Sequence, residues 1–101
     1  MILLNTTFYI HPSLTEEFSN WVKEQYIPSA LGNGLYDASL SRIMADVGED
    51  VTGYAMHLYC DSLEEAERWH DGTGAAVRET FLSRYGQKAL FFSTYMEVLP
   101  L

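Results

Sequence analysis

The sequence predicts a single α+β domain, residues 1–101, in which two helices cover one face of a four-stranded antiparallel sheet. Two observations lead to this prediction. Four short segments are rich in β-branched and aromatic residues, and two longer segments between them repeat apolar residues at helical spacing. The resulting order, βαββαβ, is the ferredoxin-like arrangement, in which right-handed crossovers place the first and third strands side by side in the centre.

The first half of the chain begins with a strand at 2–10, "ILLNTTFYI", which is too short and too β-branched for a helix. Ser13 followed by Glu16 predicts a capping box at the start of a helix. Pro28 is expected to bend or end that helix, because it removes one hydrogen bond and clashes with the preceding turn. The apolar stripe of the helix is Leu14, Phe18, Trp21, Val22 and Ile27.

The second half begins with a predicted β-hairpin, in which residues 38–47 and 52–60 are strands and "GEDVTG" is the turn. Asp61–Glu64 predicts a second capping box, and Gly72-Thr73-Gly74 is expected to break or kink the helix that follows. Gly86 is the expected residue just past the end of this helix, and residues 89–99 form the fourth strand. The apolar positions of the second helical region are Leu63, Ala66, Trp69, Val77, Phe81 and Tyr85.

Composition limits the classes of function. The formal net charge is −8, so phosphate backbones and anionic membrane surfaces would be repelled, and neither nucleic-acid nor membrane binding is expected. The single cysteine, Cys60, excludes an intrachain disulfide and is expected to be structural. No basic segment precedes an apolar stretch at the start, so no signal peptide is expected and a cytoplasmic location is predicted. Aromatic residues make up 14% of the chain, and some should line a groove or an interface.

Two helices leave one face of the sheet bare, and the alternation of side chains predicts which residues lie there. The more apolar set of the first strand, with Met56, Leu58, Phe92, Thr94 and Met96, is expected beneath the helices. If the hairpin loop holds four residues, Leu40, Arg42 and Met44 join the bare face. A symmetric homodimer that packs two bare faces together would hide them and form a dimeric α/β barrel. The other residues expected on the bare face are Leu3, Asn5, Thr7, Tyr9, Ala55, His57, Tyr59, Phe91, Ser93, Tyr95, Glu97 and Leu99.

His57 and Asn5 are the candidate catalytic residues on that face. His57 could act as a general base whose pKa is set by burial, Glu97 or Arg42, or it could be a strand histidine satisfied by a neighbour or water. Asn5 could orient a carbonyl or enolate, or make a cross-strand hydrogen bond. Arg42 could bind a carboxylate or pair with an acidic residue. Candidate ligand-binding residues are Tyr9, Arg42, Tyr59, Tyr95 and Glu97, with interface packing as the alternative role for the tyrosines.

No metal or cofactor site is predicted. No set of His, Asp or Glu has the spacing of metal ligands, and "GTG" at 72–74 lacks the preceding strand of a phosphate-binding loop. His11 and His70 lie at element ends and are expected to be exposed.

Several residues together resemble a bacterial family of domains of unknown function that is placed in the dimeric α/β-barrel, ferredoxin-like superfamily. The resemblance covers nearly the whole chain and implies this fold and a homodimer, without an activity. Haem-degrading members of the superfamily have an Asn and a Trp in places comparable to Asn5 and Trp69, but the helix from Val77 to Tyr85 lacks their haem-ligating His, so no haem is expected. The residues that carry the resemblance are "NTTF" (5–8), Trp21, "YIP" (26–28), Arg42, "YA" (54–55), Trp69 and Gly86.

Three functions are compatible with these features. The first is a homodimeric binding or interaction module without a catalytic set, possible ligands being small molecules. The second is a cofactor-independent monooxygenase or isomerase that acts on a small aromatic or conjugated ligand in the barrel. The third is an accessory subunit of a larger assembly.

Overall fold

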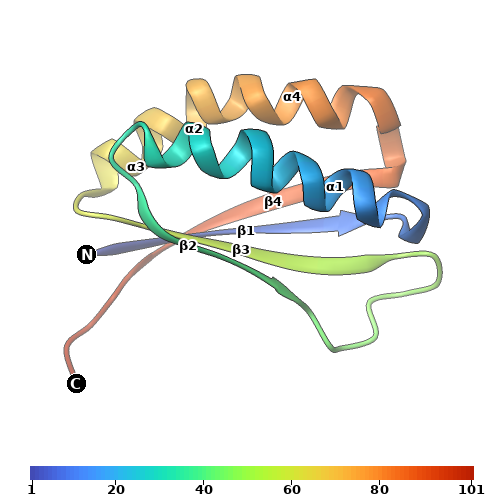
Figure 1. Cartoon of the computed structure of the whole chain (residues 1–101). Helices are drawn as coiled ribbons and strands as arrows, with labels where there is room; N and C mark the ends of the chain where they lie inside the picture. The colour runs from blue at the N-terminus through green and yellow to red at the C-terminus, as the bar shows by residue number, and fades with distance from the viewer.

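The computed structural model describes residues 1–101 and has the predicted order of strands and helices. The strands are β1 (Ile2–Ile10), β2 (Tyr36–Arg42), β3 (Thr52–Cys60) and β4 (Ala89–Glu97). They form one antiparallel sheet in the order β2-β3-β1-β4, so the first and third strands are central, as predicted. All helices lie on one side of this sheet (Figure 1). None of them has the length and apolar character needed to cross a membrane.

The first helical run continues through Pro28 instead of ending there. It comprises a 3₁₀ turn η1 (Pro12–Leu14), α1 (Thr15–Trp21), a π-helical segment η2 (Val22–Tyr26) and α2 (Ile27–Leu31). In the wide turn the N–H of Ile27 donates to the carbonyl of Val22, five residues back. A widened turn of this kind relieves the crowding that a proline ring imposes on an α-helix, so the chain remains helical.

The second helical run breaks where the glycines predict. It comprises α3 (Leu63–Asp71), α4 (Thr73–Tyr85) and a 3₁₀ turn η3 (Gly86–Lys88), with Gly72 between the two α-helices. Gly86 caps α4 with a φ of 54°, as expected for a glycine at this position.

The predicted capping boxes are only partly confirmed. The backbone N–H of Ser13 donates to Nδ1 of His11, so His11 caps the first 3₁₀ turn and Ser13 does not act as a helix cap. In the second helix the cap is Ser62, whose hydroxyl accepts the N–H of Glu65 at 3.2 Å. The side chain of Glu65 turns instead towards the buried thiol of Cys60.

An aromatic cluster between the helices and the sheet forms the centre of the core. Phe8 of β1 is fully buried, and its ring centroid lies 5.1 Å from that of Phe18, 5.9 Å from Trp21 and 5.8 Å from Tyr26. Edge and tilted contacts of this kind stabilise beyond the area they bury. The helices are thereby held on the face of β1 that carries Leu4, Phe8 and Ile10, which is the face predicted to be covered.

The alternation of β4 is the reverse of the prediction. Thr94 pairs with Asn5, and Ser93 pairs with Thr6, so Ser93, Tyr95 and Glu97 lie on the helical side. The prediction for Tyr95 and Glu97 was therefore wrong, as it was for Phe91, and Phe92, Thr94 and Met96 lie on the bare face. Both alternating sets of β4 contain large apolar residues, so hydrophobicity alone could not choose between them.

Arg42 also lies on the helical side of the sheet, contrary to the prediction. It pairs with the buried Tyr54, and Leu40 pairs with Met56. The strand ends at Arg42, so the hairpin loop spans residues 43–51 instead of four residues, and this shifts the pairing of β2 with β3 by an odd number of residues, which reverses the faces of β2. A bulge between Tyr36 and Ser39, where Asp37 has a φ of 54°, lies at the other end of the strand and does not affect Arg42. Ser39 and Ser41 take the places on the bare face that were predicted for Leu40 and Arg42.

The break between α3 and α4 predicts an unusual cost for adding one methyl group. A Cβ at Gly74 would lie 2.8 Å from the carbonyl oxygen of Trp69 and 3.0 Å from its ring. Gly74→Ala should therefore lower the free energy of unfolding by about 1–3 kcal/mol, although glycine to alanine in a helix usually stabilises. The measurement is urea unfolding. Gly32→Ala is the control, because its Cβ would meet only the Pro28 carbonyl at 3.5 Å. Equal stability of the Gly74 and Gly32 variants would contradict the packing described for the break.

Candidate functional site

On the side of the sheet that faces away from the helices, the residues placed there by strand pairing include one imidazole and no Asp, Glu, Lys or Arg. We call this surface the open face. The chain has 14 acidic and six basic residues, so the absence of Asp, Glu, Lys and Arg from a surface built by four strands is a strong segregation of charge. The open face consists of Leu3, Asn5, Thr7, Tyr9, Tyr36, Ser39, Ser41, Gly53, Ala55, His57, Tyr59, Leu90, Phe92, Thr94 and Met96.

His57 lies near the middle of the open face. It pairs with Asn5 of β1 on one side and with Ser39 of β2 on the other, so the three side chains form a row across the sheet. The imidazole makes no hydrogen bond within the chain, whereas the amide of Asn5 donates to the hydroxyl of Thr7 at 3.1 Å. The two candidate catalytic residues are thus brought together, and His57 keeps both ring nitrogens free to bind another molecule.

Large side chains stand at the two ends of the open face, and small ones occupy its middle. At one end, the rings of Tyr36 and Tyr59 stack with centroids 6.5 Å apart, and the Tyr36 hydroxyl donates to Asp61 at 2.8 Å. At the other end, the rings of Tyr9 and Phe92 lie 6.0 Å apart. The small residues around His57 are Asn5, Thr7, Ser39, Ser41, Ala55 and Thr94.

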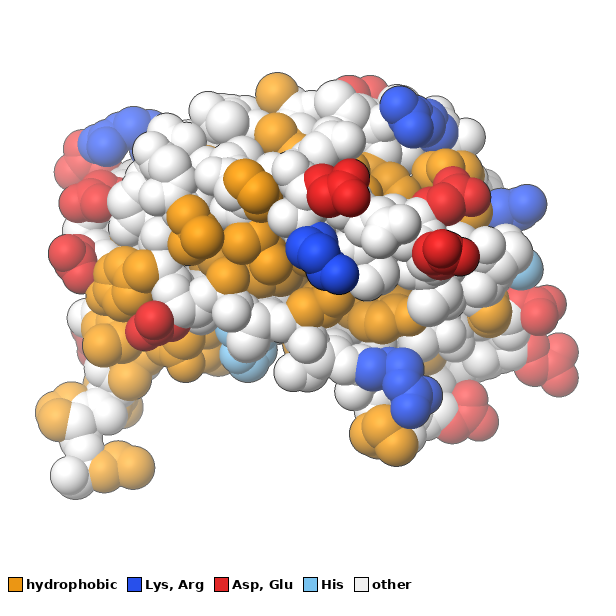
Figure 2. Space-filling view, viewed as in Figure 1, with side chains coloured by type: hydrophobic (Ala, Val, Ile, Leu, Met, Phe, Trp, Pro, Cys, Tyr) orange, Lys and Arg blue, Asp and Glu red, His pale blue; other side chains and the backbone are white.

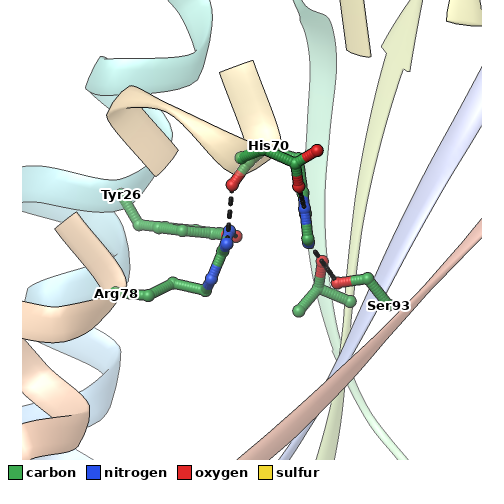
Figure 3. A network of polar contacts seen from close by, with 6 residues as sticks. Tyr26, His70, Arg78 and Ser93 are labelled. Carbon is green, nitrogen blue, oxygen red and sulfur yellow. Dashed lines mark hydrogen bonds and ion pairs between the residues drawn. The ribbon is translucent and has the colours of Figure 1, made fainter. Parts of the chain in front are cut away.

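A second polar cluster lies between the helices and the sheet, and sequence reasoning missed it (Figure 3). His70, at the end of α3, was expected to be exposed, but its side chain is only 13% exposed. Its Nε2 is 2.7 Å from the hydroxyl of Ser93, which is 3.0 Å from that of Thr6, and its Nδ1 is 2.9 Å from Asp71. Its ring also meets the edge of Tyr95. These contacts tie the end of α3 to β1 and β4.

Arg78 is the buried cation of this cluster. Its guanidinium donates to the hydroxyl of Tyr26 at 3.2 Å and to the backbone carbonyl of His70 at 2.6 Å, and it lies 4.9 Å from the centroid of the Phe91 ring. It forms no ion pair with a carboxylate, although it is only 5% exposed. Its position three residues before Phe81 on the apolar stripe of α4 was a sequence signal that could have indicated burial.

The cluster around Arg78 and His70 has the geometry of a structural clamp. Every polar group named in it is directed at another group of the protein, and no cleft is lined by Arg78, His70 or Ser93. No group of three or more His, Cys, Asp or Glu residues is placed to hold a metal ion. The open face, where His57 has free hydrogen-bonding capacity, is therefore the stronger candidate for binding.

One cleft borders the open face. It has a volume of about 170 Å³ and lies where β1 and β4 meet the β2–β3 loop. Tyr9 and Leu90, which pair across the sheet, line it. The other lining residues are His11, Asp50, Val51, Gln87 and Lys88. His57 and Asn5 lie outside this cleft.

The surroundings of Tyr95 predict a pH dependence of stability. Partial burial raises the pKa of Tyr95 to about 12, helped by the negative charges of Asp71 and Glu67 and opposed by Arg78. Because the folded protein favours the neutral phenol, this contribution to stability is present below about pH 10 and is lost as the pH rises through about 12. Between about pH 10 and 12, the free energy of unfolding measured with urea should therefore fall less steeply for the Tyr95→Phe variant than for the wild type. Tyr9→Phe is the control, and identical slopes for the Tyr95 variant and the wild type would contradict the assignment.

Solved structures with the same fold cover nearly the whole chain. A protein of Deinococcus radiodurans, provisionally assigned as an antibiotic biosynthesis monooxygenase, is 10% identical with a TM-score of 0.75, covering 100% of this chain and 95% of that one. An ethyl tert-butyl ether D (EthD) family protein of Bacillus halodurans is 17% identical with a TM-score of 0.65, covering 98% and 100%. A dimeric ferredoxin-like protein of an uncultured marine organism is 15% identical with a TM-score of 0.65, covering 99% and 96%. These likenesses confirm the ferredoxin-like fold.

The sequence itself matches one family over almost its entire length. No curated protein matches it. The family model described as a domain of unknown function, DUF4286, matches residues 1–99, which confirms the resemblance to a family of this kind. The chain therefore belongs to the DUF4286 family and has the fold of the dimeric α/β-barrel, ferredoxin-like proteins.

Proposed function

We propose that the protein is a homodimeric binding module in which two copies pack their open faces together and enclose a small polar chamber around His57. The observation that carries this proposal is the absence of Asp, Glu, Lys and Arg from the open face of a chain with a net charge of −8. A surface that stays in contact with water in a monomer can carry charged side chains at little cost. In the centres of protein interfaces, by contrast, charged residues are depleted.

The apolar content of the open face supports the same conclusion. Phe92 is 48% exposed, and Leu90 and Met96 are also exposed in the single chain. Figure 2, a side view, shows apolar side chains gathered at the lower left of the molecule, above the point where the C-terminal segment projects. A contiguous exposed patch with aromatic residues is typical of an interaction site.

The dimensions of the open face suit a dimer. Four strands about 4.8 Å apart, with nine residues at about 3.3 Å each in β1, β3 and β4, give a projected area of roughly 600 Å². Two such faces would bury about 1,200 Å² in total, which is the lower end of the range for specific, stable interfaces. A structural neighbour described as a dimeric ferredoxin-like protein shares the fold, which adds support.

The chamber follows from the distribution of side-chain sizes. Tyrosine, phenylalanine, leucine and methionine at the ends of the face would hold the two sheets apart, while Ser39, Ala55 and Thr94 leave space in the middle. The groups that reach this space are an imidazole and an amide, which offer both donors and acceptors. The ligand would therefore be small and would carry hydrogen-bonding groups, with Tyr9 and Tyr59 at the borders of the chamber.

A charge placed in the middle of the open face tests the dimer. Ala55→Glu should convert the dimer into a monomer, because association would bury an unpaired carboxylate, while the lone protomer leaves it in contact with water. The measurement is the molar mass by light scattering after gel filtration. Ala76→Glu, on the exposed side of α4, is the matched control and should stay dimeric. A monomeric wild type, or a dimeric Ala55→Glu variant, would refute this interface.

The free imidazole of His57 favours a second function, a proton-transfer enzyme of the isomerase or cofactor-independent monooxygenase type. In such an enzyme His57 would remove a proton from a carbon next to a carbonyl, and the amide of Asn5 would donate to the enolate oxygen. The provisional monooxygenase assignment of the Deinococcus neighbour makes this class worth testing. Arg42, Tyr95 and Glu97 are excluded from such a site, because they lie on the other side of the sheet.

Hydrogen–deuterium exchange tests this second function without knowledge of the natural substrate. If His57 is a base, the dimer should speed the exchange of the acidic C–H of an enolisable aromatic ketone in D₂O, followed by NMR. The exchange rate should be at least about 100-fold lower for the His57→Gln variant than for the wild type, and unchanged for the His11→Gln variant. Absence of exchange with the wild type, or equal rates for the His57 variant, would leave the protein as a binding module.

A further inference from the structure

The C-terminal segment Val98–Leu101 leaves the sheet on the side away from the helices. It follows the end of β4, where the N–H of Val98 donates to the carbonyl of Met1, and then runs below the sheet (Figure 1). Leu99 is 65% exposed and Leu101 is fully exposed, so the apolar side chains of this segment find little cover in their own protomer. Figure 2 shows the segment as one of two projections below the sheet, and the β2–β3 loop forms the other.

We propose that Val98–Leu101 of one copy docks into the cleft of about 170 Å³ at the opposite end of the open face of its partner, a cleft that Tyr9 and Leu90 border. This inference rests on the proposed dimer and specifies how the two copies are arranged. The cleft lies at the start of β4, and the segment leaves from the end of β4. A two-fold axis that lies between the sheets and runs across the strands would bring these two places together twice in each dimer.

The segment is long enough for this contact. Face-to-face sheets pack about 10 Å apart, and three extended residues span about 10 Å. Residues 99–101 can therefore cross from one sheet to the other. A two-fold axis along the strands would instead set the edge strand β4 of one copy over the edge strand β2 of the other. Both C-terminal segments would then lie at the same end of the dimer, and both clefts would stay empty.

Contact area favours docking. The two open faces alone supply only about 1,200 Å², the lower limit for a stable dimer, so two docked segments would add apolar area where it is needed. The cleft offers an apolar chain three apolar lining residues, Tyr9, Val51 and Leu90. The rest of its lining is polar, namely His11, Gln87 and the oppositely charged Asp50 and Lys88. The occupant that fits is thus the apolar segment Val98–Leu101 of a second copy of this chain.

A disulfide between the segment and the cleft tests the arrangement directly. In the double variant Leu90→Cys/Leu101→Cys, mild oxidation should give a covalent dimer in which position 90 of one copy is bonded to position 101 of the other, identified by mass spectrometry of peptides. Within one protomer Leu90 lies near the start of β4 and Leu101 lies beyond its end. The seven residue-to-residue steps from Leu90 to Glu97 span about 23 Å, and the segment then runs away from the start of the strand (Figure 1), so the bond can form only between copies. Cys60 is buried and stays in place; the oxidised wild type should remain free of covalent dimer.

Two further variants separate failure of the docking from failure of the dimer. Leu99→Ser should weaken dimerisation by at least about tenfold, whereas Leu63→Ser, on the exposed side of α3, should leave it unchanged. If the dimer dissociation constants of the Leu99→Ser and Leu63→Ser variants were equal, the proposed docking would be overturned.

The single variant Leu101→Cys reports on the alternative axis. If its two copies join through their introduced thiols, and the double variant forms no bond between positions 90 and 101, the arrangement is overturned while the proposed dimer stands. A monomeric wild type would overturn both.

Discussion

The pairing of β1 with β3 is the constraint on which the rest of the molecule depends. These two strands are central, and every residue of β1 from Ile2 to Ile10 has a partner on β3. Because side chains alternate along a strand, this register sends Phe8 and Met56 towards the helices and Asn5 and His57 to the other side. A slip of one residue would turn one of the two strands over relative to the other. It would place either the imidazole of His57 in the aromatic core, or the amide of Asn5 there with Phe8 exposed. The register therefore creates the core and the open face together.

The two faces use polar residues in different ways. On the helical side, Arg78 and His70 are buried among hydroxyls, a carbonyl and aromatic rings, which satisfy them within the chain. On the open face, His57 has no partner within the chain. His57 is only partly buried in the single chain, so water can reach its ring, and its nitrogens are free to bind another molecule. This contrast is why binding is assigned to the open face and a structural role to the Arg78 cluster.

The alternation of residues in the sequence was enough to predict which side chains of the central strands β1 and β3 face the helices. It was not enough for the edge strands β2 and β4. In β1 one alternating set is clearly more apolar, so the faces of Asn5 and Tyr9 could be predicted. In β4 both sets are apolar, and the choice was made by contacts that no local pattern reveals, such as the hydrogen bond between Ser93 and His70. Arg42 was misplaced because the hairpin loop is longer than the turn signal implied, which reverses the faces of β2. The burial of Arg78 was not predicted, because arginine is rarely buried in a protein, even at a position on the apolar stripe of a helix such as α4.

Contacts between copies are the most direct measure of whether a second chain covers the open face. In a mixture of isotope-labelled and unlabelled protein, isotope-filtered NMR detects only contacts that cross from one copy to the other. A dimer through the open face should give such contacts from Ala55, Thr94 and Phe92, with none from the outer surface of α4. Contacts from the helices alone, or none at concentrations where the protein is a dimer, would contradict it.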